Sequence, residues 1–250
     1  MNRLKTNQKK SKLLVIATNS QLKKVNQSNF NISYSGVNIP LVKEATYLGL
    51  EFKNNLSWDK HIKTLCKSLN YKNFQLKQLR KAGAPQDLLL SVYKTFIQCK
   101  FDYGISIWGM TTQYNINKIQ HKQNRAARII LGVTDFRNTC GITLVKRLGL
   151  QTIRERRNYF LTKFTFESIM GIAPDYLSTR IEMNVDRHGY NTRSSNNSDV
   201  YPPKVNKEIF RRSLVYSGAI LWNQLPLAIK ESTDTDSFKR NYRKLFTPQN

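Results

Sequence analysis

The chain has 250 residues and carries 41 lysines and arginines against 16 aspartates and glutamates, a formal net charge of +25. A positive charge of this size favours a polyanionic partner, which is nucleic acid or, less often, an anionic membrane surface. Hydrophobic residues make up 40% of the chain and aromatic residues 11%, which is enough for a packed core and argues against a disordered basic tail. The length suits one large domain or two small ones.

The three cysteines, Cys66, Cys99 and Cys140, are widely spaced and form no CxxC pair. Their odd number and spacing argue against a disulfide scaffold and a structural zinc site, and indicate buried or half-buried thiols in a reducing compartment. No uncharged apolar run reaches the ~18 residues that a membrane span needs, and the basic N-terminus lacks the apolar core of a secretory signal. We therefore expect an intracellular protein, nuclear or cytoplasmic, that is not secreted and has no membrane partner.

The first 56 residues have the pattern of a small, mostly antiparallel sheet of three or four strands. An apolar run at 13–16 is typical of a buried strand. Residues 30–34 alternate at period two and are followed by a turn at Ser35-Gly36 and by 37–40, which predicts a hairpin. One more strand is expected at 46–52.

The hydrophobic period changes to that of helices after residue 56. Ser57 can cap a helix over 58–80, in which apolar residues recur at three, four and seven and lysines take the opposite face. Further helices are expected after Pro85 and over 115–131, 143–148, 152–170 and 237–246, whereas 183–206 has the composition of a linker. The predicted fold class is α+β, mostly α, with a small antiparallel sheet, then a helical bundle and then an irregular tail.

The basic residues of the helical block are not balanced by acids. The helix over 58–80 has one acid, Asp59, and residues 118–157 contain ten lysines and arginines against two acids. A solvated helix surface usually places glutamates four residues from lysines, and the self-repulsion of an unbalanced face is relieved by a polyanion. We therefore expect phosphate contacts rather than a plain solvated surface at Lys60, Lys63, Lys67, Lys118, Lys122, Arg125 and Arg128.

The sequence contains no constellation typical of an enzyme. It has no HExxH, GxSxG, P-loop or GxGxxG motif, no two adjacent acids and no ligand-like spacing of its three histidines. His61 is expected to face solvent, and Asp102 is expected to make a helix-end hydrogen bond, with a buried polar pair as the alternative. Arg154, Arg156 and Arg157 lie in the first turns of the helix over 152–170, where they oppose the helix dipole, and this violation points to a function for their charges.

Four groups of short motifs occur along the chain in a fixed order. They are 2–12; Tyr47-Leu48-Gly49 with Leu56-Ser57-Trp58 and His61-Ile62; Phe101-Asp102-Tyr103-Gly104 with Trp108-Gly109 and 119–130; and Tyr190-Asn191-Thr192-Arg193 with Ser217-Gly218, Leu221–Pro226 and Phe238-Lys239. In this order and spacing they resemble the C-terminal part of non-LTR retrotransposon reverse transcriptases, the jockey-like group in particular. The resemblance covers nearly the whole chain.

The resemblance implies three domains. Residues 1–56 are similar to the end of the polymerase palm, 57–172 to the helical thumb that holds a template–primer duplex, and 173–250 to the post-thumb region with a linker. Tyr47, Leu48 and Gly49 resemble the strand pair near the primer grip. The implied partners are RNA, RNA–DNA hybrids, and the upstream palm and fingers of the parent polymerase.

The sequence departs from that family at the catalytic centre. The family's metal-binding aspartates lie in an aromatic-x-Asp-Asp motif upstream of the segments that match, and no Asp-Asp pair is present here. The parent enzyme would use magnesium, but we expect no cofactor, no metal ligand and no catalytic residue in this chain, which alone should not polymerise DNA. The leading expectation is a fragment of an RNA-directed DNA polymerase that retains template–primer binding. The alternatives are a basic RNA- or DNA-binding protein reused by the host without enzymatic activity, and an inert product.

Overall fold

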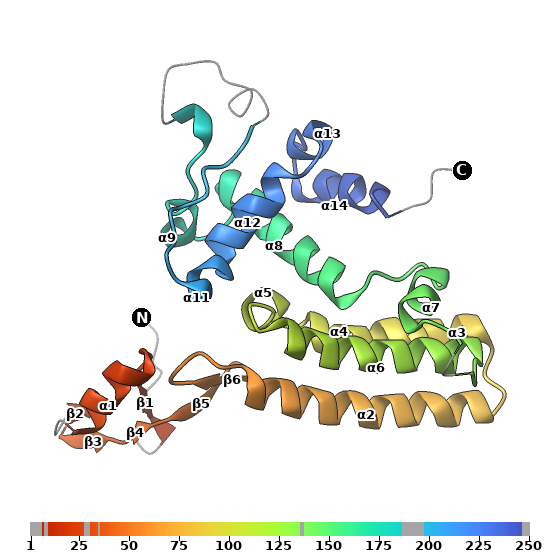
Figure 1. Cartoon of the computed structure of the whole chain (residues 1–250), viewed down its shortest axis with the longest axis horizontal. Coiled ribbons are helices and arrows are strands. Elements are labelled where there is room, and N and C mark those ends of the chain that lie inside the picture. Colours follow the sequence, from red (N-terminus) through yellow and green to blue (C-terminus); the bar gives the residue numbers. More distant parts are fainter. Residues whose placement is uncertain are drawn as a thin grey trace. The chain divides into compact units, whose positions relative to one another are not determined.

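The computed structural model describes residues 7, 10–27, 31–34, 36–135, 138–186 and 198–246. Several residues singled out above lie outside the described residues, namely most of 2–12, the turn residue Ser35 and the motif at 190–193. The chain divides into two compact units, Met1–Leu65 and Cys66–Asn250, and the division falls inside helix α2 (Asp59–Lys81) (Figure 1). The domain boundaries at 56/57 and 172/173 stay predictions.

The first unit contains helix α1 (Asn19–Gln27) and three separate two-stranded pairs. Two pairs are antiparallel: β2 (Ile32–Tyr34) with β3 (Val37–Ile39), which is the predicted hairpin, and β5 (Glu44–Tyr47) with β6 (Leu50–Lys53). The single strand expected at 46–52 is wrong, because a turn at Leu48 and Gly49 divides this segment into β5 and β6. The third pair, β1 (Leu13–Leu14) with β4 (Leu41–Val42), is parallel. The single sheet of three or four strands is therefore wrong, because Pro40 separates β3 from β4 and offers only its carbonyl, which accepts a hydrogen bond from the Leu13 amide.

The β5–β6 hairpin has an apolar, strained tip. Tyr47 pairs with Leu50, so Leu48 and Gly49 form a two-residue turn, and both have positive φ angles of 46° and 76°. This turn favours glycine or asparagine at both positions, and a leucine in the left-handed region costs roughly 1–2 kcal/mol. The tip is also open to solvent, since Tyr47 and Leu48 are 68% and 70% exposed.

His61 is buried rather than solvent-facing, which corrects the expectation from the sequence. The start of α2 folds back on β6, where the rings of Phe52 and Trp58 lie 5.2 Å apart, and the His61 ring packs edge-on against Trp58 at 5.9 Å. This contact turns the histidine inward, and its burial lowers the pKa of the imidazole below the usual value.

The named elements of the second unit, in the part that the structure describes, are all helices, which confirms the mostly α fold class. After the remainder of α2, the elements are α3 (Gln86–Val92), the π-helix η2 (Tyr93–Gln98), α4 (Cys99–Asp102), α5 (Ile105–Trp108), α6 (Gln113–Leu131), α7 (Gly141–Arg147), α8 (Ile153–Ile169), α9 (Asp175–Ser178), the short 3-10 helix η3 (Asn184–Asp186), α11 (Glu208–Arg211), α12 (Leu214–Asn223), α13 (Leu227–Lys230) and α14 (Thr235–Lys244). The tail is more regular than expected, because four of these helices, α11 to α14, follow residue 206.

The corner between α4 and α5 is fixed by the motif at 101–109. Gly104 adopts a left-handed φ of 65° at the bend, and the buried Trp108 donates its indole N–H to the Tyr103 carbonyl at 2.9 Å. Asp102 accepts two hydrogen bonds from Arg156, at 2.9 Å from Nε and 2.5 Å from Nη2. Asp102 is therefore half of a largely buried polar pair, the alternative interpretation, and the charge of Arg156 serves to join α8 to α4.

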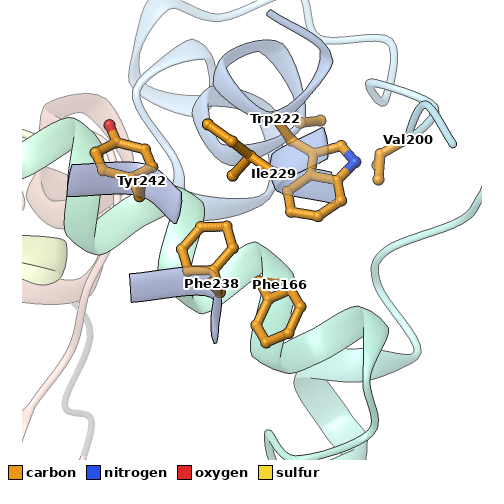
Figure 2. Packing of buried hydrophobic residues seen from close by; sticks show 7 residues of the cluster. Phe166, Val200, Trp222, Ile229, Phe238 and Tyr242 are labelled. Atoms are coloured by element: carbon orange, nitrogen blue, oxygen red, sulfur yellow. The ribbon is translucent and has the colours of Figure 1, made fainter. Parts of the chain in front are cut away.

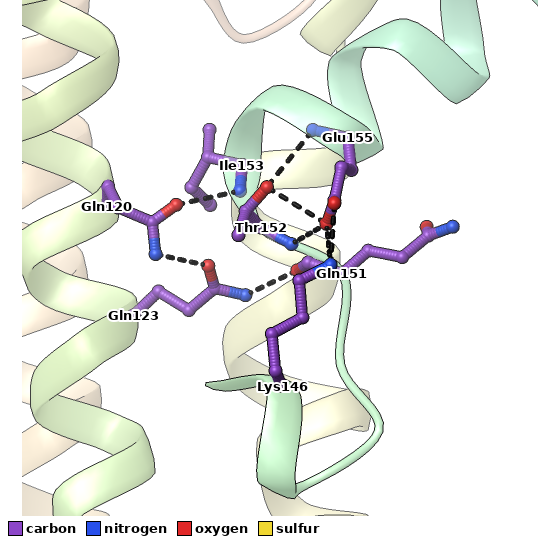
Figure 3. A network of polar contacts seen from close by, with 7 residues as sticks. All are labelled: Gln120, Gln123, Lys146, Gln151, Thr152, Ile153 and Glu155. Carbon is purple, nitrogen blue, oxygen red and sulfur yellow. Dashed lines mark hydrogen bonds and ion pairs between the residues drawn. The ribbon is translucent and has the colours of Figure 1, made fainter. Parts of the chain in front are cut away.

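The N-terminus of α8 is held by a polar network (Figure 3). The Thr152 hydroxyl accepts a hydrogen bond from the Glu155 amide, and the Glu155 carboxylate accepts one from the Thr152 amide, which together form a capping box. Gln120 of α6 accepts from the Ile153 amide at 3.0 Å, and Gln123 donates to the Gln151 carbonyl at 2.9 Å. Side chains of α6 therefore set where α8 begins.

The C-terminal helices pack on α8 around an aromatic cluster (Figure 2). Phe238 lies at its centre, stacked on Phe166 of α8 at 4.7 Å and on Trp222 of α12 at 6.3 Å, with Tyr242 on its other side. All four side chains are buried. Because each fully buried apolar side chain contributes about 1.5–3 kcal/mol, this cluster is a core of its own rather than a loosely ordered end.

The motif at 217–226 has a structural explanation. A Cβ at Gly218 would lie 2.4 Å from the Thr165 hydroxyl oxygen, so the glycine lets α12 approach α8 closely. Trp222 donates its indole N–H to the Ser198 carbonyl at 2.9 Å, and the Asn223 amide pairs with both backbone groups of Val200 at 2.8 Å. Pro226 then precedes the first turn of α13.

The cysteines differ from the expectation in their exposure. Cys66 is half-buried as expected, but Cys99 and Cys140 are exposed, and all three are free thiols. Cys99 donates to the Thr95 carbonyl on the outer side of its helix, and Cys140 stands at the residue before α7, so neither position faces the core.

We predict that Gly218→Ala destabilises the protein by about 1–3 kcal/mol, because the added methyl group overpacks the α8–α12 contact. Thr165→Ala in the same chain should recover part of this loss, since it removes the oxygen with which the methyl group collides. Urea unfolding of both single variants and the double variant measures the coupling. Strictly additive effects would contradict the close approach.

We also predict that His61 makes the free energy of unfolding depend on pH. Because the folded-state pKa is lowered, the unfolded chain takes up a proton first as pH falls, so this contribution is intact above about pH 6.5 and is lost below it. The free energy of unfolding of the wild type should therefore fall more steeply between pH 7.5 and 5.5 than that of His61→Gln. Equal slopes in urea titrations followed by tryptophan fluorescence would refute this.

Candidate nucleic-acid interface

Helices α2 and α6 run parallel and side by side in the second unit (Figure 1). The buried Asn73 amide donates to the Lys122 carbonyl at 2.9 Å, and Arg80 donates to the Ile130 carbonyl at 2.6 Å. Because residue numbers rise together along both helices at these two contacts, the helices point the same way. We call the line along which these two helices meet the α2–α6 seam.

Lys118 and Lys122 lie at this seam, facing α2. Both are half-buried, and both act electrostatically on the thiol of Cys66 in α2, whose pKa is raised by burial against their influence. The Lys118 ammonium also lies 4.1 Å from the centre of the exposed Tyr114 ring, a cation–π contact at the surface. Lys67, the residue after Cys66, is exposed.

The C-terminal ends of the two helices form a groove of about 370 Å³ that we call the end groove. Ile129 and residues 132–134 form its apolar part, and none of the described residues that line it is acidic. Its five cations are Lys77, Arg80 and Lys81 from α2, and Arg125 and Arg128 from α6. The structure thus brings together two of the residues expected from the sequence with three that sequence reasoning missed.

The five cations of the end groove have two different roles. Arg80 and Arg128 donate to backbone carbonyls, of Ile130 at 2.6 Å and Thr139 at 2.9 Å, so they hold the fold. A Cβ at Gly132 would collide with the Arg80 guanidinium at 2.1 Å, which shows how tightly that side chain fits. Lys77, Lys81 and Arg125 are exposed and make no ion pair or hydrogen bond within the described part of the chain. These three charges are open to a polyanion.

Lys60 and Lys63 belong to the first unit. Lys60 forms an ion pair with Glu44 of β5, which raises the pKa of the lysine and lowers that of the carboxyl group. Part of its charge is therefore already offset within the protein. Lys63 is exposed. The remaining expected residues, Tyr47, Leu48 and Gly49, form the hairpin tip described above, and their resemblance to a primer grip stays a prediction.

The described residues show neither a metal cluster nor a membrane span. No group of three or more histidine, cysteine, aspartate or glutamate side chains among them could hold a metal ion. No helix in the same part of the chain is both long and apolar enough to cross a bilayer.

We predict that Arg80→Ala destabilises the protein by about 1–2 kcal/mol, because it removes a charged hydrogen bond to the end of α6. Lys77→Ala, three residues away, should change the free energy of unfolding by less than about 0.5 kcal/mol. Thermal or urea unfolding of the two variants separates the cation that holds the fold from one that is open. Equal effects would contradict this division.

Comparison with known proteins gives two relatives from Drosophila melanogaster. The chain is 29% identical over 136 residues, 54% of its length, to a protein described as "Probable RNA-directed DNA polymerase from transposon BS", and 31% identical over 132 residues, 51% of its length, to "Probable RNA-directed DNA polymerase from transposon X-element". These matches span only 15% and 14% of the relatives' own lengths.

No family model matches the chain, and no solved structure resembles it closely enough to count as a match. The two relatives are nonetheless of the kind that the sequence motifs indicated, and their names agree with each other. About half of this chain is therefore a region related to the reverse transcriptases of retrotransposons.

Proposed function

We propose that the second unit binds the sugar–phosphate backbone of a template–primer duplex through the α2–α6 seam, as the nucleic-acid-binding part of an RNA-directed DNA polymerase. The observation that carries this is the end groove, in which five cations gather with no acid. The two relatives, both named as RNA-directed DNA polymerases, support nucleic acid as the polyanion.

The length of the α2–α6 seam sets the number of phosphate groups that its cations can contact. From Lys67 to Lys81 the α2 axis rises roughly 20 Å, which corresponds to about six phosphates of one strand. The end groove, at about 370 Å³, takes a phosphate group rather than a base pair. We assign the phosphate contacts to Lys67, Lys77, Lys81, Lys118, Lys122 and Arg125, with Arg128 holding the groove wall. Backbone contacts of this kind read the shape of an A-form duplex and carry little sequence information.

We do not propose that the seam residues catalyse nucleotide addition. The adjacent aspartates that the resemblance calls for have no counterpart in the 250 residues. We infer that these residues hold the duplex and that the carboxylates which bind magnesium in the parent enzyme are supplied by other protein segments.

We predict a steep salt dependence for binding of the full chain to an RNA–DNA hybrid. About six phosphate contacts should reduce the affinity roughly a thousandfold between 50 and 200 mM salt. The triple variant Lys77→Gln/Lys81→Gln/Arg125→Gln should lower the slope of log affinity against log salt by about three.

The matched control is Lys100→Gln/Lys204→Gln/Lys207→Gln, which removes the same charge from exposed lysines elsewhere in the second unit. Its salt slope should change by less than about one. If both triple variants change the slope equally, binding reflects net charge alone, and the assignment to the seam fails.

A further inference from the structure

A second basic pocket lies in the same unit, away from the residues of the α2–α6 seam. It is formed by η2, the segment at 149–151, α8 and α14, and has a volume of about 720 Å³. Among the described residues, five cationic and three aromatic side chains line it, and no acidic side chain does. This volume is in the range of pockets that hold small organic ligands.

The aromatic side chains give the pocket flat apolar surfaces. Tyr159 and Phe160 of α8 pack edge to face with their ring centres 5.2 Å apart, and Phe246 lines the pocket beyond the end of α14. The guanidinium of Arg156 lies 5.2 Å from the Phe160 ring and 5.7 Å from the Tyr159 ring. Because Asp102 holds this guanidinium in place, the stack of Arg156 on the rings is already ordered before any ligand arrives.

The cations leave a positive excess in the pocket. Three of them have carboxylate partners: Arg156 pairs with Asp102, Lys163 with Glu167, and Lys239 with Asp236. Lys94 of η2 is exposed and has no ion pair among the described residues. Arg243 of α14 adds a further charge.

Tyr159 lies among both kinds of charge. Burial and the nearby Glu167 raise the pKa of its hydroxyl group, whereas Lys239, Arg156 and Arg243 lower it, and burial has the largest effect. Tyr159 is therefore protonated at neutral pH and can donate a hydrogen bond. A hydroxyl donor among cations is suited to an anion that carries several acceptor oxygens, such as a phosphate group.

We propose that this pocket binds one unpaired nucleotide, with its base against the aromatic wall of Phe160 and Phe246 and its phosphate near Lys94 and Arg243. The ligand must be anionic and must offer a flat face; a nucleotide carries both in one unit, whereas an aspartate or glutamate side chain carries the charge alone. In a duplex both faces of a base are already stacked, so a nucleotide from a single strand or free in solution fits better. This site is independent of the duplex contact proposed at the seam.

The test uses the full chain and a fluorescein-labelled ten-nucleotide oligothymidylate, with binding followed by fluorescence anisotropy at fixed salt. Phe160→Leu keeps every charge but removes the ring face, and should weaken binding roughly tenfold. Phe96→Leu is the matched control, because Phe96 is an exposed ring on η2 that lines a different groove. It should change the affinity less than twofold.

Further variants separate the pocket from the rest of the protein. Phe160→Tyr keeps the ring and should retain binding within twofold, which guards against a folding defect in the leucine variant. Lys94→Gln/Arg243→Gln should weaken oligothymidylate binding more than Lys100→Gln/Lys204→Gln does. Binding of an RNA–DNA hybrid should stay within twofold in Phe160→Leu, whereas the seam variants should reduce it.

Competition with thymidine monophosphate distinguishes the source of the nucleotide. Displacement of the labelled strand from the wild type, but not from Phe160→Leu, indicates a pocket for free nucleotides; lack of displacement indicates a pocket for a nucleotide held within a strand. If Phe160→Leu, in a chain that circular dichroism shows to be folded, binds oligothymidylate as the wild type does, the pocket is not a nucleotide site and the inference is overturned.

Discussion

The ion pair between Asp102 and Arg156 joins residues 54 positions apart and sets where α8 lies, and the rest of the second unit depends on that helix. On one side α8 contacts α5 and α6, and on the other it contacts α12 and α14. Because α8 is packed on both sides, its apolar residues do not form a single stripe. Its position therefore depends on particular polar contacts as well as on apolar packing. Thr152 and Glu155 close its first turn, and Gln120 and Gln123 reach it from α6. A shift of α8 would therefore disturb both the helical bundle and the aromatic cluster.

Four acids of the second unit pair with cations inside the fold. Asp102, Glu155 and Glu167 each pair with a cation on or beside α8, and Asp199 holds the buried ammonium of Lys230 at 2.6 Å. Breaking the Lys230–Asp199 pair would leave a buried ammonium uncompensated. All four acids already have a partner, so they do not neutralise other cations of the surface. The positive charge that remains is concentrated where no acid is placed, above all in the end groove. The large net charge and a well-formed core are thus compatible.

Features that depend on local patterns could be predicted from the sequence. The turn between β5 and β6 was missed, because leucine is not a typical turn residue. The long helices α2, α6 and α8, the β2–β3 hairpin and the resemblance to reverse transcriptases were all visible in periodicity or short motifs. Contacts between distant residues were not. The inward turn of His61 depends on Phe52, the role of Arg156 depends on Asp102, and the order of the tail depends on Trp222 meeting Phe166. In the candidate site, Arg125 and Arg128 were found from charge alone, whereas Lys77, Arg80 and Lys81 emerge only when α2 and α6 are known to run parallel. The assignment of any of them to phosphate contact stays a prediction.

The turn at Leu48 has a consequence for how the first unit folds. A two-residue turn with favourable residues closes a hairpin early, because the turn itself lowers the free energy of the first cross-strand contact. In the β5–β6 hairpin, the leucine at a positive φ angle instead raises the free energy of that first contact. We therefore expect the β5–β6 hairpin to close late, after side chains remote from the turn have met, and the ring contact between Phe52 and Trp58 is suited to bring them together. On this expectation pairing proceeds from the open end of the hairpin toward its tip, and the exposed tip is the last part of the ladder to form and the first to fray.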